Sequence, residues 1–342
     1  MPELEFRQID LRQISELEAR AVNNFLNISR AEVMPEDPET PLATRLLEWQ
    51  NIPMRYNLAA FAFFQASCVV AFARISCDQQ GENQHLCGVN LEVLPEWRRK
   101  GLGMQLLKAV LTVAKHQQRR ILILDTSDQI PAGAYFAEKI GSIQADENHT
   151  NRLLLEELDT RLLEAWITNA PSEEFELGFY TNGYPESELE ALSTLFEVMN
   201  TAPKGELEIE DQKVTPERLR EWNQQNKARD LQCWTALVRE RRTGNYVGYT
   251  EVGLTASTPQ ILKQWSTAVN PVYRGKGLGK WLKAAMLKKV LQERPEVNQV
   301  RTSNADSNEP MLKINHALGF KPLIATTDWQ LEVETACQKL GL

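Results

Sequence analysis

The stretch VNPVYRGKGLGKWLKAAML, residues 269 to 287, places Arg274 and three glycines directly before an apolar run. The stretch VLPEWRRKGLGMQLLKAVL, residues 93 to 111, has the same layout, with Arg98 in the place of Arg274. After the glycines of both stretches, apolar residues recur every four positions, which indicates one face of a helix. The chain therefore contains the same strand, glycine turn and helix twice, and we expect a whole-domain duplication.

Length and composition support two globular domains. A chain of 342 residues is long enough for two domains of about 150 residues each. We place the first domain at residues 1–160, a linker helix at 161–174 and the second domain at 175–342. The hydrophobic share of 42% and the charged share of 25% are ordinary for folded domains with their own cores.

Charge and residue usage exclude several classes of protein. The formal net charge of −8 argues against nucleic acid as the main partner, because binding to phosphate backbones depends on positive charge. No apolar run reaches the roughly 18 residues of a membrane span. The polar start of the chain is unlike a secretion signal, so we expect a cytoplasmic protein. The five cysteines are expected to be free buried thiols, and the four histidines show no metal-ligand spacing.

The expected elements follow the same order in both halves. Strands of the first half are predicted at ELEFRQID, LAAFAFF, CVVAFARIS, HLCGVNLEV and RILILDTS. Their counterparts in the second half are FELGFYT, CWTALVRE, YVGYTEVGL, ILKQWSTAV and VNQVRTSN. We expect RLLLEEL to close the first half and WQLEV to close the second. Helices after the first strand and after each glycine turn complete an α/β pattern with a mixed sheet.

A glycine turn that opens a helix can bind an anion. The first N–H groups of a helix lack partners and carry partial positive charge, and glycine lets them approach a phosphate closely. The spacing R-x-x-G-x-G therefore predicts a pyrophosphate cradle, with the arginine adding charge. It is not a dinucleotide fingerprint, because Leu282 replaces the third glycine, nor a Walker A loop, because Trp281 follows Lys280. A turn that uses glycine only for its geometry is the alternative.

These motifs resemble the GNAT superfamily of acyl-CoA-dependent N-acyltransferases. The resemblance rests on R-x-x-G-x-G between a strand and an amphipathic helix, and on the segments TSNADSNEPMLKINHALGF and MNTAPKGELEIED. It covers nearly the whole chain and implies two tandem GNAT domains, in a layout similar to that of mycothiol synthase. It also implies acetyl-CoA as the cofactor and direct transfer of its acetyl group to a primary amine in a ternary complex.

The resemblance implies roles for particular residues. The strand that ends at Val269 would offer a backbone N–H to the thioester carbonyl, and Val93 has this place in the first half. Asn304 and Asn308 match asparagines that contact the pantetheine arm or the helix after it. The first half lacks these asparagines, so we expect catalysis in the second. The turns that would bind the cofactor consist of Arg274, Gly275, Lys276, Gly277, Leu278 and Gly279, and of Arg98, Arg99, Lys100, Gly101, Leu102 and Gly103.

The chain departs from the family in the acid that protonates the leaving thiolate. That acid is usually a tyrosine four residues before the glycine that follows the last helix. In the second half Asn315 stands in that place before Gly319, and in the first half Ala137 stands there before Gly141. The thiolate would then leave unprotonated or take its proton from water.

Two strand glutamates are candidates for the base that keeps the amine neutral. Glu251 lies on a central strand of the second half, and Glu92 lies directly before Val93 in the first. A solvent-facing role is the alternative for both. Four aromatic residues are candidates for lining the acceptor pocket, with burial in the core as their alternative: Trp234, Trp265, Tyr249 and Trp281.

We therefore expect an N-acetyltransferase that acts on a small-molecule or peptide amine, as a monomer or a homodimer. The rival interpretation is a non-catalytic acyl-CoA-binding or structural module, which the missing tyrosines favour. The acceptor does not follow from the sequence, because one fold serves many substrates.

Overall fold

The computed structural model describes residues 3–342 and divides into two compact units, neither of which is one continuous stretch of chain. Unit 1 consists of the described residues up to 147, together with 205–210 and 325–342. Unit 2 consists of 148–204 and 211–324. Among the described residues, no helix combines the length and the apolar character that crossing a membrane requires.

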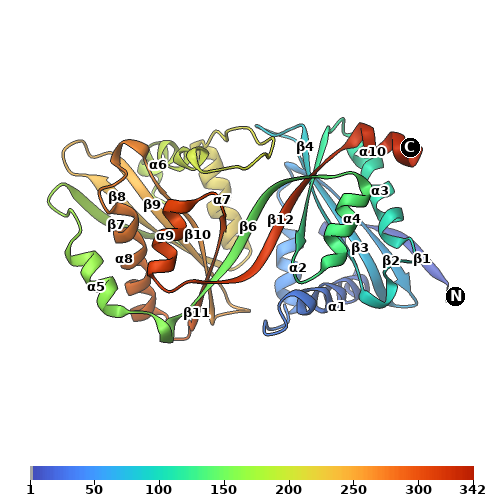
Figure 1. The fold of residues 1–342 in the computed structure, drawn as a ribbon, viewed down its shortest axis with the longest axis horizontal. Coiled ribbons are helices and arrows are strands. Elements are labelled where there is room, and N and C mark those ends of the chain that lie inside the picture. Colours follow the sequence, from blue (N-terminus) through green and yellow to red (C-terminus); the bar gives the residue numbers. More distant parts are fainter. Residues whose placement is uncertain (1–2) are drawn as a thin grey trace. The chain divides into compact units, whose positions relative to one another are not determined.

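Unit 1 is built on a mixed sheet with the strand order β1-β2-β3-β4-β5-β12 (Figure 1). Neighbouring strands are antiparallel except β4 and β5, which are parallel. The strands are β1 Leu4–Ile9, β2 Tyr56–Gln65, β3 Cys68–Asp78, β4 Leu86–Val93, β5 Ile121–Ser127 and β12 Lys321–Glu332. The helices are α1 Glu16–Val33, α2 Leu42–Gln50, α3 Leu102–His116, α4 Pro131–Ile140 and α10 Val333–Leu340.

Helices cover both faces of this sheet, which explains why β2 is an almost continuous apolar run. Phe61 and Phe63 pack into a core with α3 on one face. Ala62 and Phe64 pack into a second core with α1 on the other face. The two-residue alternation of a strand thus supplies both cores from one short segment.

Unit 2 repeats this plan with the strand order β7-β8-β9-β10-β11-β6. Its strands are β6 Ile143–Leu154, β7 Phe175–Thr181, β8 Leu231–Glu240, β9 Tyr246–Thr255, β10 Ile261–Val269 and β11 Gln299–Ala305. Its helices are α5 Thr160–Thr168, α6 Leu189–Phe196, α7 Pro216–Ala228, α8 Leu278–Glu293 and α9 Glu309–Ala317. Leu192, Leu219 and Tyr249 form a core under α6 and α7, whereas Leu282 and Met286 belong to the core under α8.

The last strands of the two halves of the sequence are exchanged. Residues 148–154 of β6 pair antiparallel with β11 of unit 2. Residues 326–332 of β12 pair antiparallel with β5 of unit 1. The expectation that RLLLEEL closes the first half and WQLEV the second is therefore wrong as to the pairing partner. Local sequence shows that a segment is a strand, but not which sheet edge it joins.

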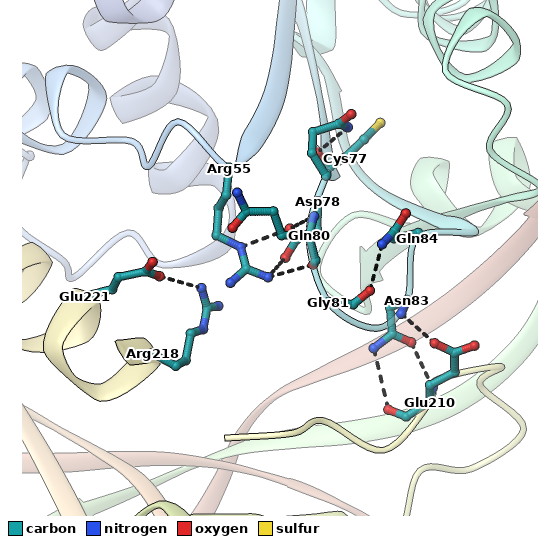
Figure 2. Close-up of polar contacts among 11 residues, drawn as sticks. Arg55, Cys77, Asp78, Gln80, Gly81, Asn83, Gln84, Glu210, Arg218 and Glu221 are labelled. Carbon is teal, nitrogen blue, oxygen red and sulfur yellow. Dashed lines mark hydrogen bonds and ion pairs between the residues drawn. The ribbon is translucent and has the colours of Figure 1, made fainter. Parts of the chain in front are cut away.

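A second segment also crosses over, because residues 205–210 belong to unit 1. Figure 2 shows Glu210 beside Asn83, which lies in the loop between β3 and β4. The Asn83 N–H donates to the Glu210 carboxylate at 2.7 Å, and the Glu210 N–H donates to Asn83 Oδ1 at 2.8 Å. These paired bonds hold the segment on the β3–β4 hairpin.

The same hairpin corrects the expectation that all cysteines are free. Cys77 on β3 and Cys87 on β4 are joined by a disulfide, with their Cα atoms 4.5 Å apart. Cys233 and Cys337 are free and buried, as expected, whereas Cys68 is free but exposed. The pair escapes a search for short cysteine motifs, because cross-strand neighbours depend on the hairpin register.

Candidate active site

The two glycine turns have matching backbones. Gly101 and Gly277 each stand directly before the helix, with φ of +85° and +82°. This left-handed conformation favours glycine. Two residues earlier, Gly275 has φ +81°, whereas the first turn holds Arg99 at φ +62°. The second turn therefore has the less strained backbone.

The second turn presents unpaired donors at the start of α8. Within residues 3–342, the N–H groups from Gly275 through Lys280 donate to no acceptor, and the first helical bond runs from Trp281 N–H to Gly277 O at 3.1 Å. Helix N-termini with free N–H groups bind anions. The turn thus has the donors that a pyrophosphate requires.

Each turn is fastened to the strand before it by its arginine. Arg98 Nε donates to Val93 O at 2.9 Å, and Arg274 Nε donates to Val269 O at 3.0 Å. The other guanidinium nitrogens of Arg98 bond both oxygens of Glu32, at 2.7 and 2.5 Å. Within residues 3–342, the other guanidinium nitrogens of Arg274 have one side-chain partner, the Thr201 hydroxyl, which accepts at 2.6 Å. Each turn thus has one cation paired with a carboxylate, because Lys276 of the second turn meets Glu174 at 2.8 Å.

β10 separates from its parallel neighbour before the turn. β10 pairs with β11 only over Ile261–Lys263, and residues 264–269 continue without that partner. β4 likewise pairs with β5 only over Leu86–Val89. Both strands that lead into the glycine turns thus separate from their parallel neighbours before they end.

A pocket of about 290 Å³ lies in unit 2 on the face covered by α7. Trp222, Asn223 and Asn226 line it from α7, Glu251 from β9, and Trp265 and Ser266 from β10. Of the four aromatic residues considered for an acceptor pocket, Trp265 lines this pocket. The other three are buried in the cores of unit 2: Trp234, Trp281 and Tyr249.

A β-bulge brings two residues of β10 to this pocket. Gln264 pairs with Val252 and Thr267 pairs with Thr250, so Trp265 and Ser266 together stand opposite Glu251 alone. A bulge bends its strand and redirects side chains. It lies in the part of β10 that has left β11, so the pocket borders the splayed strand.

Glu251 is held by a short chain of hydroxyl groups. The Tyr184 hydroxyl donates to Glu251 Oε1 at 3.0 Å and lies 2.9 Å from Thr235 Oγ1. Burial raises the pKa of Glu251 to about 7, against a smaller lowering effect of the Tyr184 hydrogen bond. Burial also raises the pKa of the neighbouring Cys233 thiol to about 12, which keeps it protonated. A carboxyl group with a pKa near neutrality suits a general base.

The first half has no equivalent base. Ala71 and Gly248 pair with the strand-end residues Val93 and Val269, and three positions further along lie Arg74 and Glu251. A cation thus stands where unit 2 has its carboxylate. The other candidate, Glu92, lies on β4 itself, where burial raises its pKa and a hydrogen bond with Ser29 partly opposes that shift.

Asn304 belongs to a buried polar chain that the sequence did not suggest. Lys283 Nζ donates to Asn315 Oδ1 at 2.8 Å, and Asn315 Nδ2 donates to Asn304 Oδ1 at 2.7 Å. Lys283 and Asn315 are 1% and 0% exposed. With both amide oxygens accepting, the chain fixes Asn304 with its NH₂ group turned away from Asn315. Asn308, the other selected asparagine, is the N-cap residue of α9.

The structure also adds residues that sequence reasoning missed. Tyr184 follows β7 and Trp222 lies on α7, far from the glycine turn in sequence, so no local motif points to them. Lys283, by contrast, could have been noticed in the sequence. The matching position of the first half is Leu107, and a lysine in the same helical register as a core leucine is unusual.

Known proteins resemble the chain at the level of family and fold. The model described as Acetyltransferase (GNAT) family matches residues 23–141 and 193–320. Comparison with curated proteins finds no match. A solved tandem GNAT protein from the clavulanic acid biosynthesis pathway is 24% identical, with a TM-score of 0.79 over 97% of this chain and 99% of that one. A GCN5-related N-acetyltransferase from Sphaerobacter thermophilus is 14% identical, with a TM-score of 0.68 over 96% of each chain.

Proposed function

Because the chain belongs to the GNAT acetyltransferase family and has two GNAT domains in tandem, we propose that it transfers an acetyl group from acetyl-CoA to a primary amine. The observation that carries this proposal is the layout of unit 2. There β10 leaves β11, borders the pocket with Glu251, and ends at the turn with free N–H groups. A site for an anion and a site for an amine thus lie along one strand.

In the proposed reaction the two substrates are bound together and the transfer is direct. The turn from Arg274 to Gly279 binds the pyrophosphate through its N–H groups, and Asn304 and Asn308 lie toward the pantetheine arm. Acetyl-CoA supplies the activated carbonyl carbon. Glu251 accepts a proton from the ammonium group in the pocket, which leaves a neutral amine to attack. The new C–N bond replaces the C–S bond, the nitrogen loses its extra proton to water, and the sulfur leaves as the thiolate.

The second half carries catalysis in this proposal. Among the described residues Arg274 meets no carboxylate, whereas Arg98 is paired with Glu32. Unit 2 has the carboxylate of Glu251 at the strand position where unit 1 has the cation Arg74. The first turn, from Arg98 to Gly103, is then a cofactor site without a base or a structural counterpart.

Calorimetric titration of acetyl-CoA tests the proposal, with Arg98→Glu and Arg274→Glu alongside the unaltered protein. We expect binding that Arg274→Glu weakens strongly, together with release of CoA thiol when an amine is added. Binding without thiol release from any primary amine would favour the non-catalytic acyl-CoA-binding module. No binding at all would contradict both.

We further propose that the enzyme works in the cytoplasm on a small amine, as a monomer or homodimer. The disulfide between Cys77 and Cys87 is the observation that counts against a reducing compartment. A count of free thiols in protein taken directly from cells addresses this point.

A further inference from the structure

We propose that the pocket beside Glu251 selects a compact monocationic amine whose other polar groups are uncharged. This inference rests on the proposed function, since the bound amine is the acetyl acceptor. It commits to a substrate class that excludes amino acids and other amines bearing a carboxylate.

The carboxylate of Glu251 has no counter-ion among the described residues. Glu251 forms no ion pair with a lysine or arginine in the described part of the chain, and its Oε2 atom has no hydrogen-bond partner there. The titratable groups that face it, Tyr184, Cys233 and Tyr249, are all neutral acids at pH 7. Glu251 is half-buried, and a carboxylate partly removed from water is stabilised by a cation that enters the pocket beside it. An ammonium group in the pocket supplies both the charge and the missing donors.

Two tryptophans form an aromatic side of the pocket. Trp222 and Trp265 line the pocket together with Glu251, and the face of an indole ring attracts cations. Arg218 already lies over the Trp222 ring, 5.5 Å from its centroid, so the proposed cation contact is with Trp265. Trp265 is seated against β9 by a glycine. A Cβ added to Gly253 would lie only 2.3 Å from the Trp265 ring. The Trp265 ring can therefore occupy this position only because residue 253 has no side chain.

The described residues that line the pocket include no cation. None of its residues is a lysine, arginine or histidine, and the polar groups beside Glu251 include the neutral Asn223, Asn226 and Ser266. These can bond hydroxyl or amide groups, whereas a carboxylate on the ligand would meet no cation and would repel Glu251. At about 30 Å³ for each water-sized group, the volume corresponds to about ten such groups. This favours a small molecule over a peptide.

Three probes of matched length test the inference by calorimetry, in the presence of saturating CoA, which cannot transfer an acetyl group. They are 4-aminobutanol, a cation, 4-aminobutanoate, a zwitterion, and 1,4-butanediol, which is neutral. We expect 4-aminobutanol to bind about tenfold or more tightly than either of the others. Glu251→Gln should remove this preference, and Glu190→Gln, at an exposed glutamate on α6, should leave it unchanged.

Trp265→Leu is a second variant in case Glu251→Gln fails to fold. It retains the carboxylate and should weaken 4-aminobutanol by about two- to fivefold without affecting the diol. The inference is overturned if 4-aminobutanol does not bind at millimolar concentration, or if either other probe binds within about threefold of it.

A parallel assay of thiol release from acetyl-CoA separates this inference from the proposed function. If 4-aminobutanol binds as expected but is never acetylated, the pocket inference stands and the proposed activity fails. If 4-aminobutanoate is acetylated as well as 4-aminobutanol, and Glu251→Gln changes neither reaction, the activity stands and the pocket inference fails.

Discussion

Replacing Lys283 with methionine should change how stability depends on pH. Burial lowers the pKa of Lys283 to about 7, against about 10.4 in an unfolded chain. Between these values the unfolded chain binds more protons than the folded one, so the free energy of unfolding rises as the pH rises. For this single group the increase between pH 7 and pH 9 is about 2 kcal/mol.

Methionine keeps most of the lysine volume and does not titrate. At pH 7 the unfolded chain of the unaltered protein is stabilised by about 4 kcal/mol, because Lys283 takes up a proton when it becomes exposed. Methionine removes this stabilisation of the unfolded chain. It leaves Asn315 Oδ1 without its donor, at a cost of about 1–3 kcal/mol. We therefore expect Lys283→Met to be more stable than the unaltered protein by about 1–3 kcal/mol at pH 7, and to lose about 2 kcal/mol of that advantage by pH 9.

Urea unfolding at pH 7, 8 and 9 measures this difference, because effects of other titrating groups cancel between the two proteins. Lys288→Met, at a more exposed position of the same helix, is the control and should show no such slope. The double variant Lys283→Leu with Asn315→Ala copies the residues of the first half, Leu107 and Ala137. It also removes Lys283, so its difference from the unaltered protein should change with pH as that of Lys283→Met does. A difference between Lys283→Met and the unaltered protein that stays constant from pH 7 to pH 9 would refute the argument, since Lys283 would then titrate as in the unfolded chain.

Three further predictions concern the base, the turn and the disulfide. The acetylation rate should rise with pH through about 7 as Glu251 loses its proton, and Glu251→Gln should lower kcat/KM by about 100-fold and abolish this step in the pH–rate profile. Gly277→Ala has open space for its Cβ but keeps φ +82°, so it should cost about 1–2 kcal/mol of stability and weaken acetyl-CoA binding in calorimetry, whereas Gly101→Ala should affect stability alone. Unfolded, non-reduced protein should show three reactive thiols, because Cys77 and Cys87 are paired, and reduction should lower the free energy of unfolding by up to about 3 kcal/mol in denaturant titrations.

Features governed by local sequence were predictable here. The apolar run of β2 and the four-residue spacing after each glycine turn depend only on neighbours in the chain, and both elements form as expected. Glu251 was selected because it lies on a central strand of the second half, and the structure places it in the lining of the pocket. The duplication was visible because the turn backbones require glycine at matching positions.

Features governed by three-dimensional pairing were not predictable. The partners of β6 and β12, and the contact between Cys77 and Cys87, depend on which strands meet and in what register. Tyr184 joins Glu251 across 67 positions of the chain. The bulge that turns Trp265 toward Glu251 adds one residue to β10 and leaves no pattern in the sequence.

The exchange of β6 and β12 has a consequence for the history of the gene. In a single copy of the repeat, the last strand could pair with the β5 equivalent of the same copy or, as β6 and β12 do here, with that of a second copy. Such reciprocal donation between identical chains is domain swapping. The fused chain therefore resembles an ancestral swapped dimer whose two subunits have become covalently joined. Joining also allows the two copies to differ, so that Glu251 stands in one copy at the position that Arg74 has in the other.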